Sequence, residues 1–204
     1  MTQINKILMT TLRNKNTSMQ QFRTTADKIA LSLAQESFNY LKIKKEQITT
    51  PLNTETDGFF LEQDIILVPI LRSGLALLPA FLNLYPHAKV GVVGLKRDEK
   101  TAIAHLYYKN LPHITSKDHV IVLDPMLATG GSTAATLKIL TDLGIKEEQM
   151  LFVGVICATE GLKKINTEFP KVQTIIAAHD SQLSDKKFII PGLGDFGDRY
   201  FGTL

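Results

Sequence analysis

The feature that most restricts the fold of this sequence is the alternation of short aliphatic runs with helical patterns. Five runs rich in Val and Ile have the length and composition of strands buried on both faces. Helical patterns at residues 131–144 and 159–169 follow the third and fourth runs. This alternation predicts an α/β fold, with a central, mainly parallel sheet flanked by helices. The five runs are residues 64–70, 89–95, 119–124, 150–156 and 172–178.

Another helix is expected near the beginning of the chain. Thr17 or Ser18 can cap it, with Gln20 or Gln21 three residues later in a capping box. The sequence shows no repeat, linker or low-complexity tract, so residues 1–204 are predicted to form a single domain. The apolar stripe of this helix, which must pack on another element, comprises Phe22, Ala26, Ile29, Ala30, Leu33, Phe38 and Leu41.

Composition and charge disfavour several classes of protein. Hydrophobic residues make up 44% and charged residues 21% of the chain, as in ordinary globular proteins. The net charge is +3 and the lysines are interleaved with acids, so no nucleic-acid-binding arm is indicated. The apolar stretch 65–82 contains Arg72, Pro69 and Pro79, which argue against a membrane span. The single Cys157 and the lack of a signal peptide core favour a reducing, cytoplasmic location.

The third aliphatic run ends in a carboxylate and leads through small residues into a helix. After Asp124, residues 128–132 (Ala-Thr-Gly-Gly-Ser) can direct backbone N–H groups into one concavity. This predicts an anion cradle at the edge of the sheet where ligands bind. No Lys follows the glycines, so it is not a Walker loop, and a neighbouring carboxylate favours a phosphorylated sugar. The alternative is a tight turn that Asp124 caps.

Two arginines follow other predicted strands. Arg72 comes after the first run and Arg97 after the second, both at carboxyl ends. The guanidinium fork fits phosphate oxygens, so the pair is expected to clamp a diphosphate opposite the cradle. A structural ion pair is the alternative for each arginine, and for Arg97 it is equally favoured.

A second glycine cluster lies at residues 192–197 and matches the GxGxxG pattern. Only seven residues follow it, too few for the helix and strand that would complete a dinucleotide-binding unit. It is therefore predicted to be a loop whose main-chain groups read the edge of a flat polar ring.

Together these segments resemble the type I phosphoribosyltransferases and, among them, the uracil phosphoribosyltransferases. The resemblance runs from LRNKNTS at 12–18, with Phe22-Arg23, to FGT at 201–203. It implies a small hood formed by the terminal segments, and the conversion of uracil and phosphoribosyl diphosphate to UMP and diphosphate. Its most specific segments are VPILRSG, GLKRDEKT, YYKNLP, LDPMLATGGS and IIPGLGDFGDRYFGT.

The resemblance also implies roles for individual residues. Arg72 and Arg97 would stabilise the leaving diphosphate, and Asp195 is the candidate general base. Tyr107 and Tyr108 correspond to a lid over the site, although aromatics on a strand or a dimer surface are an equal alternative. The implied uracil contacts, mostly backbone, are Ile189, Gly194, Asp195 and Phe196. The implied contacts to phosphoribosyl diphosphate are Arg72, Arg97, Asp124, Pro125, Met126, Leu127, Ala128, Thr129, Gly130, Gly131, Ser132 and Asp195.

The resemblance implies partners as well. Mg²⁺ would be carried by phosphoribosyl diphosphate rather than bound directly by the protein, GTP activates some relatives, and a homodimer or larger homo-oligomer is expected. Two positions depart from the family pattern, since Phe196 and Ser73 stand where Ala is usual. Phe196 leaves the size of the base pocket open. The rival functions are transfer to orotate or a purine, and a phosphoribosyl-diphosphate-sensing regulator that binds nucleic acid, which the near-neutral charge disfavours.

Overall fold

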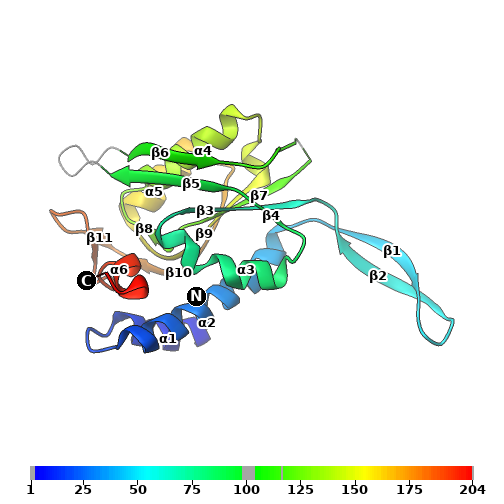
Figure 1. The fold of residues 1–204 in the computed structure, drawn as a ribbon, viewed down its shortest axis with the longest axis horizontal. Coiled ribbons are helices and arrows are strands. Elements are labelled where there is room, and N and C mark those ends of the chain that lie inside the picture. The colour runs from blue at the N-terminus through cyan, green and yellow to red at the C-terminus, as the bar shows by residue number, and fades with distance from the viewer. Residues whose placement is uncertain (1–2, 98–103, 116, 204) are drawn as a thin grey trace.

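The computed structural model describes residues 3–97, 104–115 and 117–203, with only the backbone of residues 97 and 104. Its centre is a sheet with the strand order β10-β9-β7-β3-β5-β6, parallel throughout except for β6, which runs antiparallel to β5 (Figure 1). This confirms the mainly parallel sheet. The strands are β3 (Ile65–Leu71), β5 (Val92–Arg97), β6 (Ala104–Asn110), β7 (His119–Leu123), β9 (Met150–Ala158) and β10 (Gln173–Asp180), with short β4 (Lys89–Val90) on β3 and β8 (Met126–Leu127) on β9.

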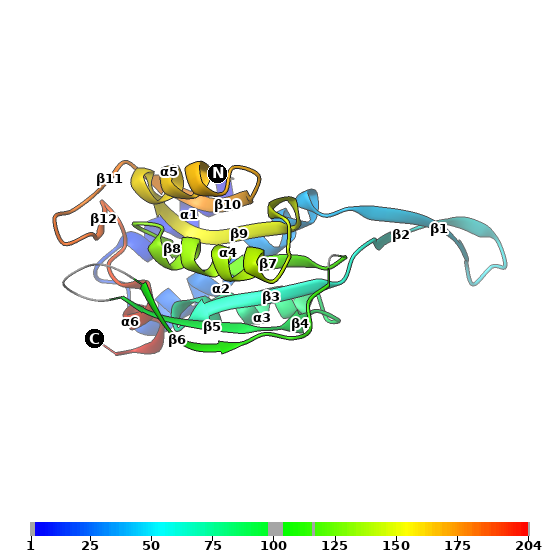
Figure 2. The same ribbon diagram turned by 90° about the horizontal axis from the view of Figure 1, so that it is seen from above.

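Helices cover both faces of this sheet (Figure 2). Successive side chains of a strand point to opposite faces, so Ile65 and Leu67 join one core while Ile66 and Val68 join the other. The described residues include no helix with the length and apolar character needed to cross a membrane. The first core packs under α1 (Gln3–Arg13), α2 (Met19–Ser37), α3 (Leu78–Leu84) and α6 (Phe196–Phe201), and the second under α4 (Gly131–Asp142) and α5 (Thr159–Glu168).

The predicted N-terminal helix is α2, and its capping box is confirmed. Ser18 accepts from the Gln21 N–H at 3.3 Å, and Gln21 accepts from the Ser18 N–H at 3.3 Å. The end of the predicted stripe was wrong. Phe38 lies in the 3₁₀ turn η1 (Phe38–Tyr40), where its ring stacks on Tyr85 at 4.6 Å, and Leu41 follows that turn. Both side chains are placed by a tertiary contact rather than by helical periodicity.

Two predicted strands differ in detail from the structure. The second run is interrupted at Gly91, which separates β4 from β5. The fifth run forms β10, whose Gln173 and His179 are exposed because β10 is an edge strand. The run is still buried on both faces, since Ile175 and Ala177 lie in one core while Val172 and Ile176 join the other, but β10 is less completely buried than β3, β7 and β9.

Several elements were not predicted. The most prominent is a hairpin of β1 (Ile43–Thr49) and β2 (Glu55–Leu61), which projects from the body of the molecule (Figure 2). The terminal segments lie together, since α6 packs on α2 and its Arg199 binds carbonyls at the end of α1 (Figure 1). The others are α1, β6, α3, α6, the 3₁₀ turns η2 (Ser73–Ala76) and η3 (Glu147–Gln149), and a small pair of strands, β11 (Gln182–Leu183) and β12 (Ile189–Ile190).

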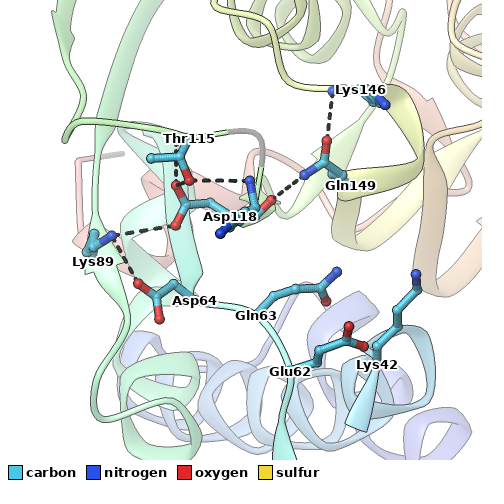
Figure 3. Close-up of a pocket in the computed structure, with 10 residues that line it drawn as sticks. Lys42, Glu62, Gln63, Asp64, Lys89, Thr115, Asp118, Lys146 and Gln149 are labelled. Carbon is cyan, nitrogen blue, oxygen red and sulfur yellow. Dashed lines mark hydrogen bonds and ion pairs between the residues drawn. The ribbon is translucent and has the colours of Figure 1, made fainter. Parts of the chain in front are cut away.

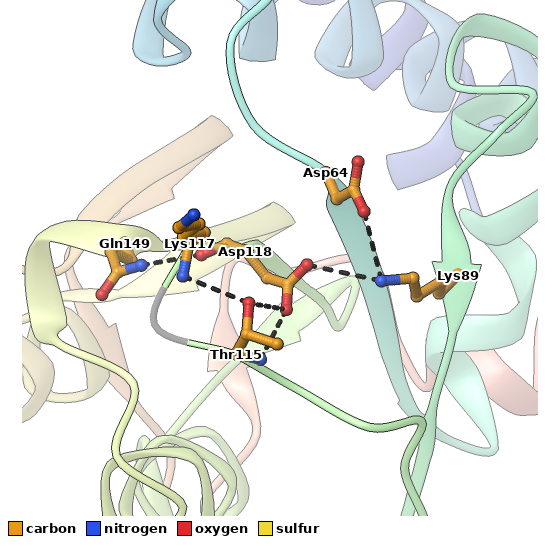
Figure 4. A network of polar contacts seen from close by, with 6 residues as sticks. All are labelled: Asp64, Lys89, Thr115, Lys117, Asp118 and Gln149. Carbon is orange, nitrogen blue, oxygen red and sulfur yellow. Dashed lines mark hydrogen bonds and ion pairs between the residues drawn. The ribbon is translucent and has the colours of Figure 1, made fainter.

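The amino edge of the sheet carries a polar network around Asp118, beside an open cavity of about 670 Å³ (Figure 3). Asp118 accepts from the Thr115 N–H at 2.5 Å, the Thr115 hydroxyl at 2.9 Å and Lys89 Nζ at 3.5 Å. Lys89 also binds Asp64, and Gln149 donates to the Asp118 carbonyl at 2.8 Å (Figure 4). Burial alone would raise the pKa of Asp118, but the Thr115 and Lys89 donors hold it below its ordinary value.

Candidate active site

Three neighbouring strands end at the carboxyl edge of the sheet, opposite the Asp118 network. Arg72 follows β3, Asp124 follows β7, and the backbone of Arg97 ends β5. Because β7, β3 and β5 are adjacent and parallel, these residues leave the sheet side by side. The Arg97 side chain lies outside the described part of the structure, so its predicted role stays a prediction.

The turn after β7 presents a helix N-terminus without a side-chain cap. Gly130 is the N-cap of α4, with a left-handed φ of 78° that favours glycine. The first turn of α4 has no acidic residue, and the bond from Ala134 N–H to the Gly130 carbonyl closes it at 2.8 Å. The N–H groups of residues 131–133 therefore face outward with the positive end of the helix dipole. Asp124 does not cap this helix; it accepts from the Met126 N–H at 3.4 Å.

Asp124 is held in an environment that disfavours its charged form. Burial, opposed by the single Met126 N–H and assisted by the nearby charge of Asp195, raises the pKa of this carboxyl to about 7. Carboxylates beside one another in a cleft favour a cation or hydroxyl donors between them. The described residues contain no group of three His, Cys, Asp or Glu side chains able to hold a metal ion. Asp124 and Asp195 would nevertheless place hard oxygens, the kind that suit Mg²⁺, near an ion carried in by a phosphorylated substrate.

Arg72 presents half of its side chain to solvent, at 49% exposure. Its Nη2 donates to Asp198 Oδ1 at 2.9 Å and to the Thr203 hydroxyl at 3.0 Å, and its guanidinium lies 5.3 Å from the centre of the Phe201 ring. Asp198, Phe201 and Thr203 all come from α6 or the residues just after it. The C-terminal segment thus orients the guanidinium while leaving it accessible to an anion.

The predicted base loop runs from Ile189, which is buried in β12, to Asp195. Gly194 is exposed with φ of 82°, and its N–H and C=O make no hydrogen bond with the described part of the chain. Asp195 is the N-cap of α6, where its Oδ1 accepts from the Asp198 N–H at 2.9 Å. The loop therefore offers a peptide donor, a peptide acceptor and a carboxylate at one place.

The position of the Phe196 ring shows whether it narrows the base pocket. The side chain is fully buried, packed edge-on against Phe22 at 5.2 Å and stacked on Tyr200 at 5.9 Å. Its N–H approaches the Met126 sulfur at 3.3 Å. The ring points away from the site into the core beneath α2, so only the backbone of Phe196 is available to a ligand.

The residues predicted to form a lid lie on a strand. Tyr107 and Tyr108 belong to β6, the antiparallel edge strand, with 60% and 46% of their surfaces exposed. The Tyr107 ring covers Gly94 of β5, where a Cβ would lie 2.7 Å from the ring. The strand alternative therefore describes these two residues in this structure, whereas residues 98–103, which lead into β6, lie outside the described range.

The structure brings the other predicted segments together. Met126, in the turn after β7, contacts Phe196, which directly follows the base loop, and the charge of Asp195 acts on Asp124. Arg72 binds Asp198, which follows the base loop. Segments of the sequence that are far apart therefore surround one site at the carboxyl edge.

Three residues at this site were missed by sequence reasoning: Arg13, Asp180 and Arg199. Arg13 and Arg199 donate to carbonyls of the base loop, and Asp180 accepts from it. Arg13 lies within the LRNKNTS segment, and Asp180 comes two residues after the aliphatic run 172–178, much as Asp124 ends the run 119–124. That parallel was the one signal in the sequence that could have identified Asp180.

Comparison with known proteins agrees with this geometry. The family model described as uracil phosphoribosyltransferase matches residues 1–203. The chain belongs to the uracil phosphoribosyltransferase family. It is 38% identical to a uracil phosphoribosyltransferase of Dictyostelium discoideum, over 97% of this chain and 92% of that one.

Solved structures place the fold of this family member. A protein from Aquifex aeolicus superposes with a TM-score of 0.90 at 36% identity, covering 98% of this chain and 95% of that one. A purine phosphoribosyltransferase from Pyrococcus horikoshii reaches a TM-score of 0.50 at 12% identity, covering 78% and 82%. The latter likeness concerns the fold alone, which is the type I phosphoribosyltransferase fold.

Proposed function

We propose that this chain is a glycosyltransferase that joins uracil to the ribose of phosphoribosyl diphosphate, giving UMP and diphosphate. The observation that carries the proposal is the convergence of the uncapped α4 N-terminus, Arg72 and the open Gly194 peptide at one edge of the sheet. These groups match a monoester phosphate, a diphosphate and a flat base with polar edges. The family to which the chain belongs supports the same reaction.

The 5-phosphate would bind at the start of α4. Hydrogen bonds to a charged phosphate contribute about 1.5 to 3 kcal/mol each, and the helix dipole adds up to about 2 kcal/mol when partly buried. Residues 124–132 surround this place, with Asp124 at its inner side. The ribose hydroxyls would donate to the Asp124 carboxylate, which compensates for the burial that raises its pKa.

The diphosphate would be held by Arg72, and in our proposal by Arg97 as well. As the C1–O bond breaks, negative charge builds on the departing diphosphate, and fixed cationic groups stabilise that charge. Arg72 is already oriented by Asp198 and Thr203, so its guanidinium needs little reorganisation to meet the leaving group. Mg²⁺ carried in with the substrate would supply further charge neutralisation near Arg72.

The base would be read by the loop 189–195. Uracil N1 forms the new bond to C1 with its lone pair and loses its proton, and the C1–O electrons leave with diphosphate. Asp195 is the proposed base, because its Oδ1 is engaged by the Asp198 N–H while its Oδ2 makes no hydrogen bond with the described residues. The buried orientation of Phe196 leaves the pocket as open as an alanine would.

We also propose a domain organisation, an oligomeric state and modes of regulation for this protein. A single domain is supported by two cores that share one sheet. A homo-oligomer is supported by the projecting hairpin, where Ile43 and Phe59 are 60% and 65% exposed. Lid closure by residues around Tyr107, activation by GTP and a cytoplasmic location are proposed on the family resemblance and on the sequence.

The test is an assay of base specificity. Purified protein with Mg²⁺ and phosphoribosyl diphosphate is incubated with uracil, orotate, hypoxanthine or adenine, with and without GTP, and nucleotides are separated and quantified. UMP from uracil alone is expected. Formation of a nucleotide from orotate or a purine would show that this base, rather than uracil, is the substrate. No UMP, together with tight, salt-sensitive binding of RNA, would favour the regulator instead.

A further inference from the structure

The base loop is held at Gly192 by two charged residues from outside the loop. Asp180, the last residue of β10, accepts from the Gly192 N–H at 2.8 Å. Arg13, the last residue of α1, donates to the Gly192 carbonyl at 2.8 Å. Both backbone groups of one glycine are therefore committed to side chains that come from distant parts of the sequence.

These two side chains also form a bidentate pair. Arg13 Nη1 and Nη2 lie 2.7 and 2.6 Å from the two carboxylate oxygens of Asp180. Asp180 is 5% exposed, and a buried carboxylate that loses its cation is strongly destabilised. Burial alone would raise the pKa of Asp180, but hydrogen bonds from Arg13 and Gly192 hold it below its ordinary value. The pair is thus a fixed, charged support.

The loop cannot easily accommodate another arrangement at this point. Gly192 has a φ of 64°, and a Cβ there would lie 2.1 Å from the Ile189 carbonyl oxygen. The next carbonyl, that of Leu193, accepts from Arg199 at 2.6 Å. Arg199 also donates to the Leu12 and Asn14 carbonyls at the end of α1, at 2.5 and 2.8 Å. Two arginines therefore tie the loop to the C-terminal turn of α1.

These contacts restrict the orientation of the next residue, Gly194. With Gly192 and Leu193 held, the exposed Gly194 peptide is the part of the loop whose N–H and C=O bind no described residue. We propose that Arg13 and Asp180 are positioning residues that fix the orientation of the Gly194 peptide and thereby set the affinity of the enzyme for its base. This inference rests on the proposed function and adds two residues to it that do not touch substrate.

The experiment compares steady-state kinetics of wild type, R13K and D180N. Lysine keeps the charge of Arg13 but loses the fork, and asparagine keeps the shape of Asp180 but loses the charge. A displacement of about 1 Å in a positioned group can cost about 10²-fold. We expect the KM for uracil to rise about tenfold or more, with the KM for phosphoribosyl diphosphate within about threefold of wild type.

R23K is the matched control. Arg23 also joins an N-terminal helix to a C-terminal carbonyl, that of Tyr200 at 2.8 Å, but it does not bind residues 189–195. The same substitution there is expected to leave the KM for uracil unchanged. Active R13K and D180N with a wild-type KM for uracil would overturn the inference, as would an equal rise in R23K. A wild type that makes no UMP would overturn the proposed function as well.

Hydrogen exchange of the wild type gives a readout that does not depend on variants that fold. The Gly192 amide, bonded to a buried carboxylate, is expected to exchange at least about tenfold more slowly than the Gly194 amide. Equal, fast exchange at both amides would show that the loop is not held and would overturn the inference.

Discussion

The two ends of β7 carry the same residue type in opposite electrostatic states. Asp118, just before the strand, receives three hydrogen bonds from Thr115 and Lys89, and its pKa is lowered. Asp124, just after the strand, receives one long bond from Met126 and faces the charge of Asp195, and its pKa is raised to about 7. At the amino edge, protein groups supply the hydrogen bonds that Asp118 accepts. At the carboxyl edge, Asp124 has few protein partners and remains available to a ligand.

This difference separates a stabilising site from the proposed binding site. A carboxylate whose folded pKa is lowered stabilises the folded state at neutral pH, and one whose pKa is raised opposes folding there. Binding sites commonly carry such unfavourable groups, because the ligand supplies the missing partner. At neutral pH, Asp124 at the carboxyl edge therefore lowers the free energy of unfolding, whereas Asp118 at the amino edge raises it.

The largest expected effect comes from removing a cation at the carboxyl edge. R72Q should lower kcat about 10²- to 10³-fold, as loss of one preorganised group at a developing charge typically does. The matched change at the amino edge is K89Q, since Lys89 also pairs with an aspartate but lies at the opposite end of the sheet. Its kcat should stay within about twofold of wild type. Initial rates of UMP formation measure both, and equal losses would remove the functional distinction between the edges.

A smaller effect, of opposite sign at the two aspartates, is expected in the free energy of unfolding. D118N should lower it by about 1.5 to 3 kcal/mol, because charge-assisted hydrogen bonds in a buried site are lost. D124N should raise it at pH 8 by about 1 to 3 kcal/mol, since a neutral amide removes a partly buried charge that has one protein donor. Urea unfolding measures both values, and activity should fall only in D124N. If both substitutions lowered the free energy of unfolding, the inferred difference between the two edges would be wrong.

The smallest change per measured step is the pH dependence of unfolding that these signs require. The folded state holds the Asp124 proton up to about pH 7, and the unfolded state releases it near pH 4. The wild type should therefore lose stability relative to D124N as pH rises through that window, by at most about 1.4 kcal/mol per pH unit. The stabilisation from Asp118 behaves oppositely, being present above pH 4 and lost as pH falls through its lowered pKa. Denaturation at several pH values checks both slopes.

The sequence predicted the parts of the fold whose signal is local. The runs that became β3, β7 and β9 are continuous because both faces of those strands are buried. The glycines after β7 predicted a tight turn into a helix, because glycine readily adopts the left-handed φ of the N-cap at Gly130. The hairpin gave no such signal, since every residue of β1 is exposed and burial imposes no alternation on it.

The remaining site features depend on distant contacts. Arg13 and Asp180 are 167 positions apart, and nothing in their spacing shows that they pair. The side on which the Phe196 ring lies was equally hidden, because it depends on the packing of α6 against Phe22 of α2. Sequence patterns therefore located the chemical groups, whereas their mutual orientation required the assembled core.

The arginine contacts to the base loop have a consequence for how the molecule forms. Arg13 reaches Gly192 across 179 positions, and Arg199 reaches Leu12 across 187. Closing such long intervals is among the slow steps of folding. On the ribosome, the sheet strands and the turn after β7 emerge before Arg199 does, so a nascent chain can form the turn proposed to bind phosphate before the loop proposed to bind the base is fixed in place.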